Sequence, residues 1–244
     1  MRYFLELSYF GKNYHGWQIQ PDANSVQEEL NKAVSVVLQE EISVVGAGRT
    51  DTGVHATQMF AHFDTSKNLD ANFVFKFNSV LPEDIVVYHL EKVADNKHAR
   101  FDAVTRSYEY RIWLGRNPFN LDTTWQFYHK KLDIEAMNAA ASILLEYQDF
   151  QAFSKVKTDV KTFLCTVTEA KWILDDHNLT FHITANRFLR NMVRAIVGTL
   201  VDVGKHKITK EDFRKIILSK DRSNAGLSVP AKGLFLTSIT YEHE

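Results

Sequence analysis

The sequence predicts an α+β protein built of two similar β-α-β-β-α-β halves, with mixed or antiparallel sheets joined across a central cleft. Stretches in which apolar and polar residues alternate, as in half-buried strands, are interleaved with stretches of helical periodicity. The same order of elements occurs twice along the 244 residues, and a split β-α-β unit repeated in this way is typical of α+β folds. Apolar residues make up 45% of the chain, which is enough for a buried core.

The first half is expected to begin with a strand and a capped helix. Residues 3–10 alternate as a strand, and Ser25 with Glu28 is the pattern of a helix capping box. The apolar stripe of this helix is formed by Val26, Leu30, Ala33, Val34, Val37 and Leu38. The remaining expected elements are a short strand at 42–45, a strand at 58–63, a helix at 72–80 and a strand at 85–90.

The second half is expected to repeat this order. Its elements are a strand at 104–113, a helix at 134–145, strands at 163–174 and 179–184, a helix at 187–203, an extra helix at 210–218 and a final strand at 234–241. We place the boundary near residues 94–103. This gives an N-terminal α/β subdomain of residues 1–98 and a C-terminal α/β subdomain of residues 99–244.

Composition excludes several classes of protein. The single cysteine, Cys165, cannot build a disulfide framework or a cysteine-based zinc site, and we expect it to be a buried apolar residue. The ten histidines form no His-Glu-x-x-His pair and no compact ligand cluster, so His55 and His62 are expected to be structural. The N-terminus lacks the apolar run of a signal peptide, and no apolar run is long enough to span a bilayer. We therefore expect a soluble cytoplasmic protein with no membrane partner and no metal.

The formal net charge of −1 conceals an uneven distribution. Residues 1–96 carry 7 basic and 13 acidic side chains, whereas residues 97–131 carry 7 and 3, and residues 180–224 carry 10 and 4. Two basic segments in a neutral chain can form one basic surface, as in proteins that bind nucleic acid. Solvated helix faces also carry such segments, so charge alone leaves both interpretations open.

The stretch GAGRTDTGVHA, residues 46–56, matches three known motifs only in part. Asp51 stands where a dinucleotide-binding loop needs its third glycine, and Val54 with His55 replaces the lysine and hydroxyl residue of a P-loop. A single Asp-Thr-Gly also lacks the second carboxylate of an aspartic protease. From the residues alone, the stretch is best interpreted as a turn in which Asp51 bonds nearby backbone N–H groups.

The helix predicted at 187–203 has an apolar side and a line of arginines. Arg187, Arg190 and Arg194 lie opposite the apolar stripe, a pattern typical either of an exposed face or of a surface that binds an anion. Gly198 follows Arg194 by four residues on the same face. Because a glycine inside a helix costs about 1 kcal/mol relative to alanine, we expect another group to approach the helix closely at Gly198.

The strand predicted at 104–113 places Arg106, Tyr108, Tyr110 and Ile112 on one face. Tyrosines on a strand usually belong to a core. With an arginine beside them, they can instead stack on a nucleobase and hold its phosphate. No serine-histidine-aspartate signature and no pair of acid–base carboxylates is evident, so any chemistry depends on Asp51 alone.

Five blocks of the sequence resemble the tRNA pseudouridine synthase A family. They are YFGKNYHGWQIQ with SVQEEL, GAGRTDTGVHA, HARFDAVTRSYEY, NRFLRNMVRAIVGTL and AGLSVPAKGLFL, in the family's order and over nearly the whole chain. Thr52 stands where alanine is usual and Phe10 where aspartate is common. These departures bear on sequence preference rather than on the chemistry.

The resemblance implies the pseudouridine synthase fold and a cofactor-free isomerisation of uridine to pseudouridine at tRNA positions 38, 39 and 40, in the anticodon stem-loop. By position, it makes Asp51 the catalytic nucleophile and Arg194 its partner. It implies that Tyr108 contacts the target base and that Arg49 helps to extrude it. Because Arg106 shares the strand face of Tyr108, we expect Arg106 to bind substrate as well. It also implies a homodimer in which tRNA crosses both subunits.

Each chemical route to pseudouridine requires an ionised Asp51. The reaction breaks the C1′–N1 bond, turns the uracil and rejoins it through C5. A carboxylate can assist by attacking C6 of the base or C1′ of the sugar, or by taking a C2′ proton. A nearby arginine favours the charged form of a carboxylate, so we predict an Asp51–Arg194 ion pair at the base of the cleft. The glycines at 46, 48 and 53 are expected to let ribose and phosphate approach the backbone.

In this interpretation the N-terminal subdomain contains the catalytic loop 46–56, and the C-terminal subdomain contains the tyrosine strand 104–113 and the arginine helix 187–203. Two other classes stay open. A non-catalytic RNA-binding module would use the same basic surface with Asp51 as a turn residue. A nucleotide-dependent RNA methyltransferase would have to bind S-adenosylmethionine.

Overall fold

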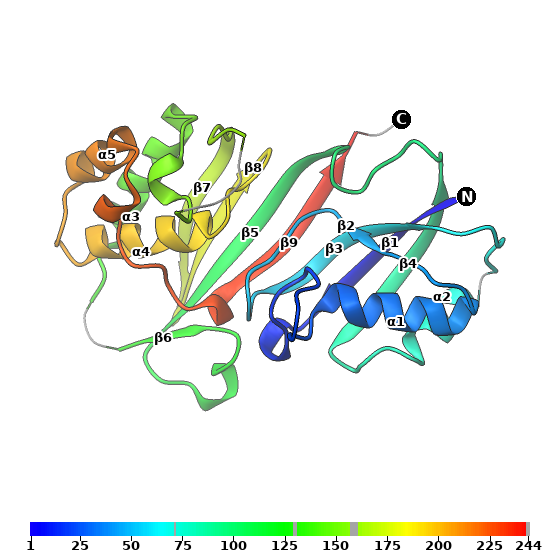
Figure 1. The fold of residues 1–244 in the computed structure, drawn as a ribbon. Coiled ribbons are helices and arrows are strands. Elements are labelled where there is room, and N and C mark those ends of the chain that lie inside the picture. The colour runs from blue at the N-terminus through cyan, green and yellow to red at the C-terminus, as the bar shows by residue number, and fades with distance from the viewer. Residues whose placement is uncertain (71, 129–130, 157–160, 243–244) are drawn as a thin grey trace. The chain divides into compact units, whose positions relative to one another are not determined.

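The structure, a computed structural model, describes the whole chain except residues 71, 129–130, 157–160 and 243–244. The chain divides into two compact units (Figure 1). Unit 1 contains Met1–Val104 and Phe235–Glu244, and unit 2 contains Thr105–Leu234. The predicted α+β class, with mixed and antiparallel sheets, is confirmed.

The strands of unit 1 form a mixed sheet. They are β1 (Arg2–Tyr9), β2 (Val45–Gly46), β3 (His55–Asp64), β4 (Ile85–Val93) and β9 (Leu234–Tyr241). The order is β4-β1-β3-β9, with β2 beside β3. The pairs β1–β3, β1–β4 and β2–β3 are antiparallel, whereas β9 runs parallel to β3.

Two helices, α1 (Val26–Leu38) and α2 (Phe73–Asn78), cover one face of this sheet (Figure 1). In β1 every second residue is buried, as its alternating sequence predicts. Ser25 caps α1 as predicted, accepting the backbone N–H of Glu28 at 3.3 Å. The Glu28 carboxylate pairs with Lys32 Nζ at 2.8 Å. The core of unit 1 therefore lies between the helices and the inward face of the sheet.

Unit 2 has an antiparallel sheet in the order β5-β8-β7, with β6 parallel to β5. Its strands are β5 (Ala103–Leu114), β6 (Trp125–Phe127), β7 (Val167–Asp175) and β8 (Asn178–Ala185). Its helices are α3 (Ile134–Ala141), α4 (Met192–Gly204) and α5 (Lys210–Ser219). Nearly every residue of α4 is buried, so this helix is the centre of the unit's helical layer.

The predicted helix at 187–203 starts too early, because α4 begins at Met192. Asn191 has a φ of 65°, and this left-handed backbone conformation does not continue a right-handed helix. Arg187 and Arg190 therefore precede α4, and only Arg194 of the three predicted arginines belongs to it. The predicted line of three arginines along one helix face is wrong.

Two further elements differ from the sequence prediction. The strand predicted at 163–174 begins at Val167, because Phe163 and Cys165 bond instead to the backbone of Phe150 and Gln148. The strand β6, which is three residues long, is too short to show a periodic pattern. Cys165 is buried as expected.

The final strand returns to unit 1. The sequence-based division assigns all of residues 99–244 to the second half, whereas β9 pairs with β3 through His55 and Ala56. The side chain of Gln58 accepts the Ile239 N–H at 3.0 Å, and the Tyr241 hydroxyl bonds the Ala99 carbonyl at 2.7 Å. Such a pairing between distant segments leaves no signal in local sequence.

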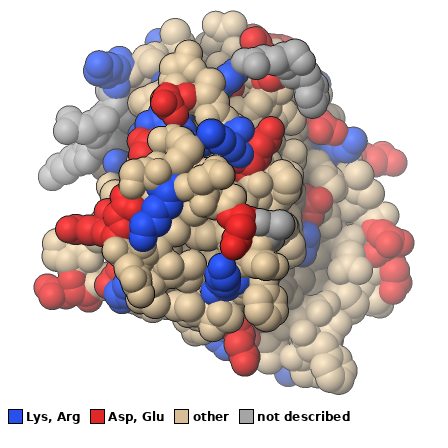
Figure 2. All heavy atoms as spheres, turned by 90° about the vertical axis from the view of Figure 1, so that its right-hand side faces the viewer, with Lys and Arg blue, Asp and Glu red and all other residues tan. Residues whose placement is uncertain are grey.

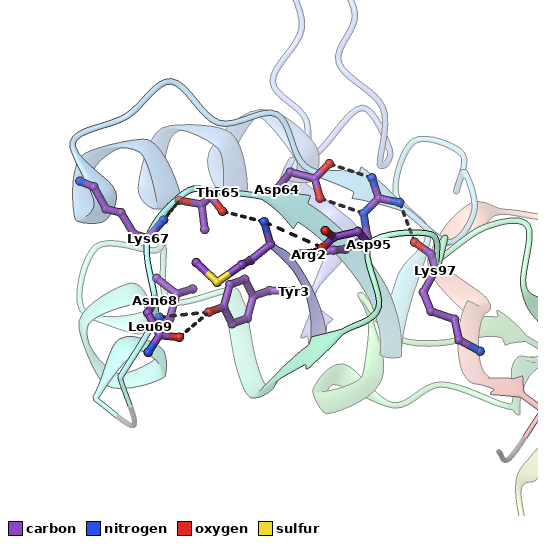
Figure 3. Close-up of polar contacts among 10 residues, drawn as sticks. Arg2, Tyr3, Asp64, Thr65, Lys67, Asn68, Leu69, Asp95 and Lys97 are labelled. Carbon is purple, nitrogen blue, oxygen red and sulfur yellow. Dashed lines mark hydrogen bonds and ion pairs between the residues drawn. The ribbon is translucent and has the colours of Figure 1, made fainter.

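The first residues of β1 are fixed by polar contacts to two loops (Figure 3). Arg2 holds Asp64 with two hydrogen bonds, at 2.9 and 2.7 Å, and donates a third to the Lys97 carbonyl at 2.7 Å. The Met1 amino group donates to the Thr65 carbonyl at 3.1 Å. The hydrogen bond from Arg2 also holds the pKa of the Asp64 carboxyl below its usual range. These contacts secure the end of β1 opposite to the end at which Tyr9 pairs with Ala56.

Surface charge is mixed on the face shown in Figure 2, where acidic and basic side chains are interspersed rather than gathered by sign. No helix in the described part of the chain is both long and apolar enough to cross a membrane.

His62 on β3 is buried and hydrogen-bonded, as a structural histidine should be. It is 3% exposed, and its Nδ1 accepts the Ala99 N–H at 3.2 Å. Burial lowers the pKa of His62 to about 4 from 6.5, and the positive charge of Arg2 and the neighbouring His98 act in the same direction.

This depressed pKa predicts an acid-labile contribution to stability. Between pH 6.5 and 4 the unfolded imidazole binds a proton that the folded one does not. The free energy of unfolding should therefore fall as the pH drops through this window, by up to about 3 kcal/mol. In urea titrations, His62→Asn, which keeps an acceptor near Nδ1, should flatten this dependence. His89→Asn, at an exposed histidine of β4, should leave it unchanged. An equally steep loss in His62→Asn would contradict the assignment.

Candidate active site

Asp51 lies in a tight turn between β2 and β3. The Val54 N–H donates to the Asp51 carbonyl at 3.1 Å, and Gly53 has a φ of 76°, which favours glycine. The turn interpretation is thus correct for the backbone. The side chain of Asp51 is half-buried, Arg49 is exposed, and Thr50 between them is buried.

A second segment, residues 14–17, braces this turn. The Trp17 N–H donates to the Thr50 carbonyl at 3.3 Å, and the Gly53 N–H donates to the Tyr14 carbonyl at 3.2 Å. The Tyr9 hydroxyl bonds the Thr50 hydroxyl at 2.8 Å in a buried position. Asp51 is therefore flanked on both sides by backbone that is held to other parts of unit 1.

Three glycines permit this close packing. A side chain on Gly16, which has a φ of 93°, would overlap the Thr50 carbonyl. One on Gly11 would overlap the Val54 carbonyl, and one on Gly46 the Trp17 indole. Position 46 requires a glycine because the Trp17 indole packs against it, whereas Gly48 has open space around its Cα. Of the glycines expected to admit substrate, Gly48 leaves room for an approaching group and Gly46 does not.

His55, at the end of the turn, is structural, as expected. It is 1% exposed and lies between the rings of Phe10 and Phe235, at centroid distances of 4.5 and 4.6 Å. Its Nδ1 accepts the Gly11 N–H at 3.0 Å. The imidazole thereby joins β3, β9 and the segment after β1 beneath the turn.

In unit 2, the burial of the β5 face that contains Arg106, Tyr108, Tyr110 and Ile112 changes along the strand. Tyr110 and Ile112 are buried in the core, whereas Arg106 and Tyr108 are half-buried. The usual core interpretation is therefore correct for one end of the strand only. Arg106 Nη1 donates to the Asn186 carbonyl at 2.9 Å.

Phe188 is a ring neighbour of Tyr108. Phe188 meets the Tyr108 ring edge-on, with centroids 5.1 Å apart and an interplanar angle of 87°. This edge-to-face contact favours one orientation of the two ring planes relative to each other.

Arg194 lies in the first turn of α4 and is oriented by a carbonyl. Its Nε donates to the Val229 carbonyl at 2.8 Å, and its own carbonyl accepts the Val229 N–H at 3.3 Å. The Tyr110 hydroxyl donates to the next carbonyl, that of Pro230, at 2.9 Å. Burial raises the pKa of Tyr110, and the nearby Arg194 charge opposes this rise. Arg194 and the core tyrosine of β5 are therefore held by adjacent peptide groups.

The expected close approach at Gly198 is confirmed, and its cause is the protein itself. A side chain on Gly198 would overlap the Leu227 carbonyl. The segment that passes there also contains Val229, which Arg194 bonds. Gly198 and Arg194 therefore contact the same segment where it crosses α4.

Sequence reasoning missed the residues that brace Asp51, namely Tyr9, Gly16 and Trp17. Their glycines and aromatics were visible in YFGKNYHGWQ, but nothing in that block shows that its partner is the turn at 50–53. Asp51 and Arg49 belong to unit 1, whereas Arg194, Tyr108 and Arg106 belong to unit 2. The Asp51–Arg194 ion pair stays a prediction.

Two hollows, of about 360 and 440 Å³, lie elsewhere in the described structure. The first lies beside α3 and the start of α5, and the second beside β4 and α2. None of the five candidate site residues lines either hollow.

The bracing of the turn can be tested with two glycine variants. Gly16→Ala should lower the free energy of unfolding by more than about 1 kcal/mol, because it combines a positive φ with overlap onto Thr50. Gly48→Ala, which has open space, should change it by less than about 0.5 kcal/mol. Chemical denaturation measures both. Equal effects would show that the turn does not depend on the contact with Gly16.

Comparison with known proteins identifies the family. A family model described as tRNA pseudouridine synthase matches residues 7–102 and 140–242. The chain is 51% identical to tRNA pseudouridine synthase A of Bacteroides thetaiotaomicron over 247 aligned residues, covering 100% of this chain and 91% of that protein. It is 40% identical to tRNA pseudouridine synthase A of Bacillus licheniformis over 248, covering 100% of both.

Among solved structures, Thermus thermophilus Cse3 bound to an RNA matches at 10% identity and a TM-score of 0.24, covering 84% of this chain and 97% of that chain. This similarity is too low to inform fold or function. The family match and the two relatives extend over both compact units and include the braced turn at Asp51. The chain belongs to the tRNA pseudouridine synthase family.

Proposed function

We propose that this protein converts uridine to pseudouridine at positions 38, 39 and 40 in the anticodon stem-loop of tRNA, with Asp51 as its nucleophile. Membership of the family supports an isomerase that acts on tRNA. The observation that carries the assignment of the nucleophile is the placement of Asp51, a half-buried carboxylate on a turn whose backbone is anchored on both sides. Such anchoring lowers the cost of orienting a reacting group.

The reaction requires one carboxylate from the protein and a site that holds the detached base. The C1′–N1 bond breaks, the uracil turns, C5 bonds to C1′, and the C5 proton is exchanged for one on N1. Asp51 assists as an ionised group, by attack on C6 or C1′ or by accepting the C2′ proton. The open space at Gly48 leaves room for ribose or phosphate beside it.

The target base must leave the stem before it can react, which costs a few kcal/mol. Arg49, exposed two residues before Asp51, is proposed to occupy the vacated space. Tyr108 is proposed to stack on the extruded ring while it is detached, with Phe188 as its ring neighbour. Arg106 is proposed to hold the adjoining phosphate, and Arg194 to pair with Asp51 and keep it ionised.

We also propose that the protein is a cytoplasmic homodimer whose tRNA contacts both subunits, and that the reaction uses no small-molecule cofactor. The competing class, a non-catalytic RNA-binding module, would share the basic segments but not the turnover. Family membership favours the enzyme over that alternative.

Asp51→Asn separates the enzyme from the binding module. The change keeps the shape of the side chain and removes its charge. We expect tritium release from tRNA labelled at C5 of uridine to fall by at least about 10³-fold, while tRNA binding stays within a few-fold. Asp176→Asn, at an exposed turn where φ is 51°, should leave both unchanged. Undiminished release in Asp51→Asn would exclude Asp51 as the nucleophile.

Arg194→Lys tests whether a guanidinium, rather than any positive charge, is required at this position. Lysine cannot reproduce the Nε donor that reaches Val229. We expect kcat to fall at least about tenfold and the Kd for tRNA to change less than about threefold. Arg214→Lys, at an arginine that pairs with Glu146 on the surface, is the matched control. An unchanged kcat in Arg194→Lys would remove Arg194 from the proposed site.

A further inference from the structure

Residues 225–229, which we name the strap, cross α4 at Gly198 and Thr199 and present one leucine to solvent. Leu227 is 88% exposed, although it lies between two residues whose backbones are bonded to α4. A single exposed leucine on a mobile loop would need no explanation. This one is carried by a backbone that the rest of unit 2 holds in place.

The strap is anchored on the N-terminal side of Leu227. The Gly226 N–H donates to the buried Thr199 hydroxyl at 2.9 Å, and Gly226 packs so closely on Thr199 that a side chain would meet its backbone at 3.0 Å. The Ala225 carbonyl accepts from Arg222 Nη1 at 3.2 Å. The chain before Leu227 therefore has little freedom to withdraw the side chain.

The strap is equally anchored on the C-terminal side. The Ser228 hydroxyl is bonded by Asn191 Nδ2 at 2.6 Å and by Arg222 Nη2 at 3.1 Å. Val229 exchanges two hydrogen bonds with Arg194, through its N–H and its carbonyl. Between these anchors the Leu227 carbonyl packs on Gly198, which directs the side chain away from the helix.

Leu227 and Arg194 lie on the same side of α4. Positions 194 and 198 are one helical turn apart and share a face, and the strap contacts both of them. Arg194 and Arg222, which bond Val229 and Ser228, place positive charge at the strap, and positive charge attracts phosphate. An apolar group among such cations fits a nucleic acid, in which base faces and ribose carbons lie next to phosphates.

We propose that Leu227 is an RNA-contact residue, held out by the strap to pack against a base or ribose next to the target uridine. The inference rests on the proposed function in taking tRNA as the ligand and Arg194 as part of the site. It adds an apolar contact to the charged contacts proposed above.

The test is tRNA affinity, measured in the Asp51→Asn background so that turnover plays no part. Leu227→Ala should raise the Kd about tenfold, and Leu227→Gln, which is similar in length but polar, should do the same. Leu227→Met should stay within about twofold of the parent, because it restores an apolar side chain. Leu218→Ala, at a leucine of α5 that is 58% exposed, is the matched control and should also stay within about twofold.

Two further readouts separate RNA contact from other roles. The slope of log Kd against log salt should be the same for Leu227→Ala and the parent, because no phosphate contact is lost. Sedimentation equilibrium should show the same oligomeric state. Unchanged affinity in both Leu227→Ala and Leu227→Gln would overturn the proposal, and a change of oligomeric state would assign Leu227 to a subunit contact instead. Failure of the Asp51→Asn activity test would leave this affinity result intact, so the two outcomes are distinguishable.

Discussion

The candidate site depends on one constraint, the fixing of the turn at residues 50–53 by the chain segment before α1. The Trp17 N–H reaches the Thr50 carbonyl, and Gly16 packs against the same peptide group with no room for a side chain. The buried hydroxyl pair of Tyr9 and Thr50 adds a side-chain contact at 2.8 Å. A carboxylate on a free surface turn would sample many orientations, and each would have to be given up on binding. The fold of unit 1 instead fixes the backbone on both sides of Asp51.

A comparable constraint acts on Arg194 in unit 2. Its guanidinium is tied to the Val229 carbonyl, and the strap that carries Val229 is admitted by a glycine in the middle of α4. The cost of Gly198 to the helix, about 1 kcal/mol, is thus offset by hydrogen bonds between strap and helix. Each unit therefore holds one charged candidate residue on a backbone that is fixed by a close glycine contact.

The elements and several roles could be predicted from sequence because their signals are local. The alternation of β1, the Ser25 cap and the buried stripe of α1 depend on neighbouring residues. A glycine inside a helix, Gly198, likewise predicted that another group approaches the helix closely. What could not be predicted was long-range or conformational. The left-handed Asn191 shortens α4, and the bracing of Asp51 by Trp17 joins segments more than thirty residues apart. Neither feature produces a periodic pattern of apolar residues in the sequence.

The most direct test of the account is a crystal structure of the protein bound to tRNA that carries 5-fluorouridine at the target position, since fluorine at C5 blocks loss of the proton that completes the reaction. The account predicts the extruded nucleotide against the Asp51 carboxylate, bonded to it or within about 3.5 Å, with Arg194 beside the carboxylate and residues 50–53 as in the free protein. An Asp51 side chain directed into solvent, away from both the nucleotide and Arg194, would contradict it.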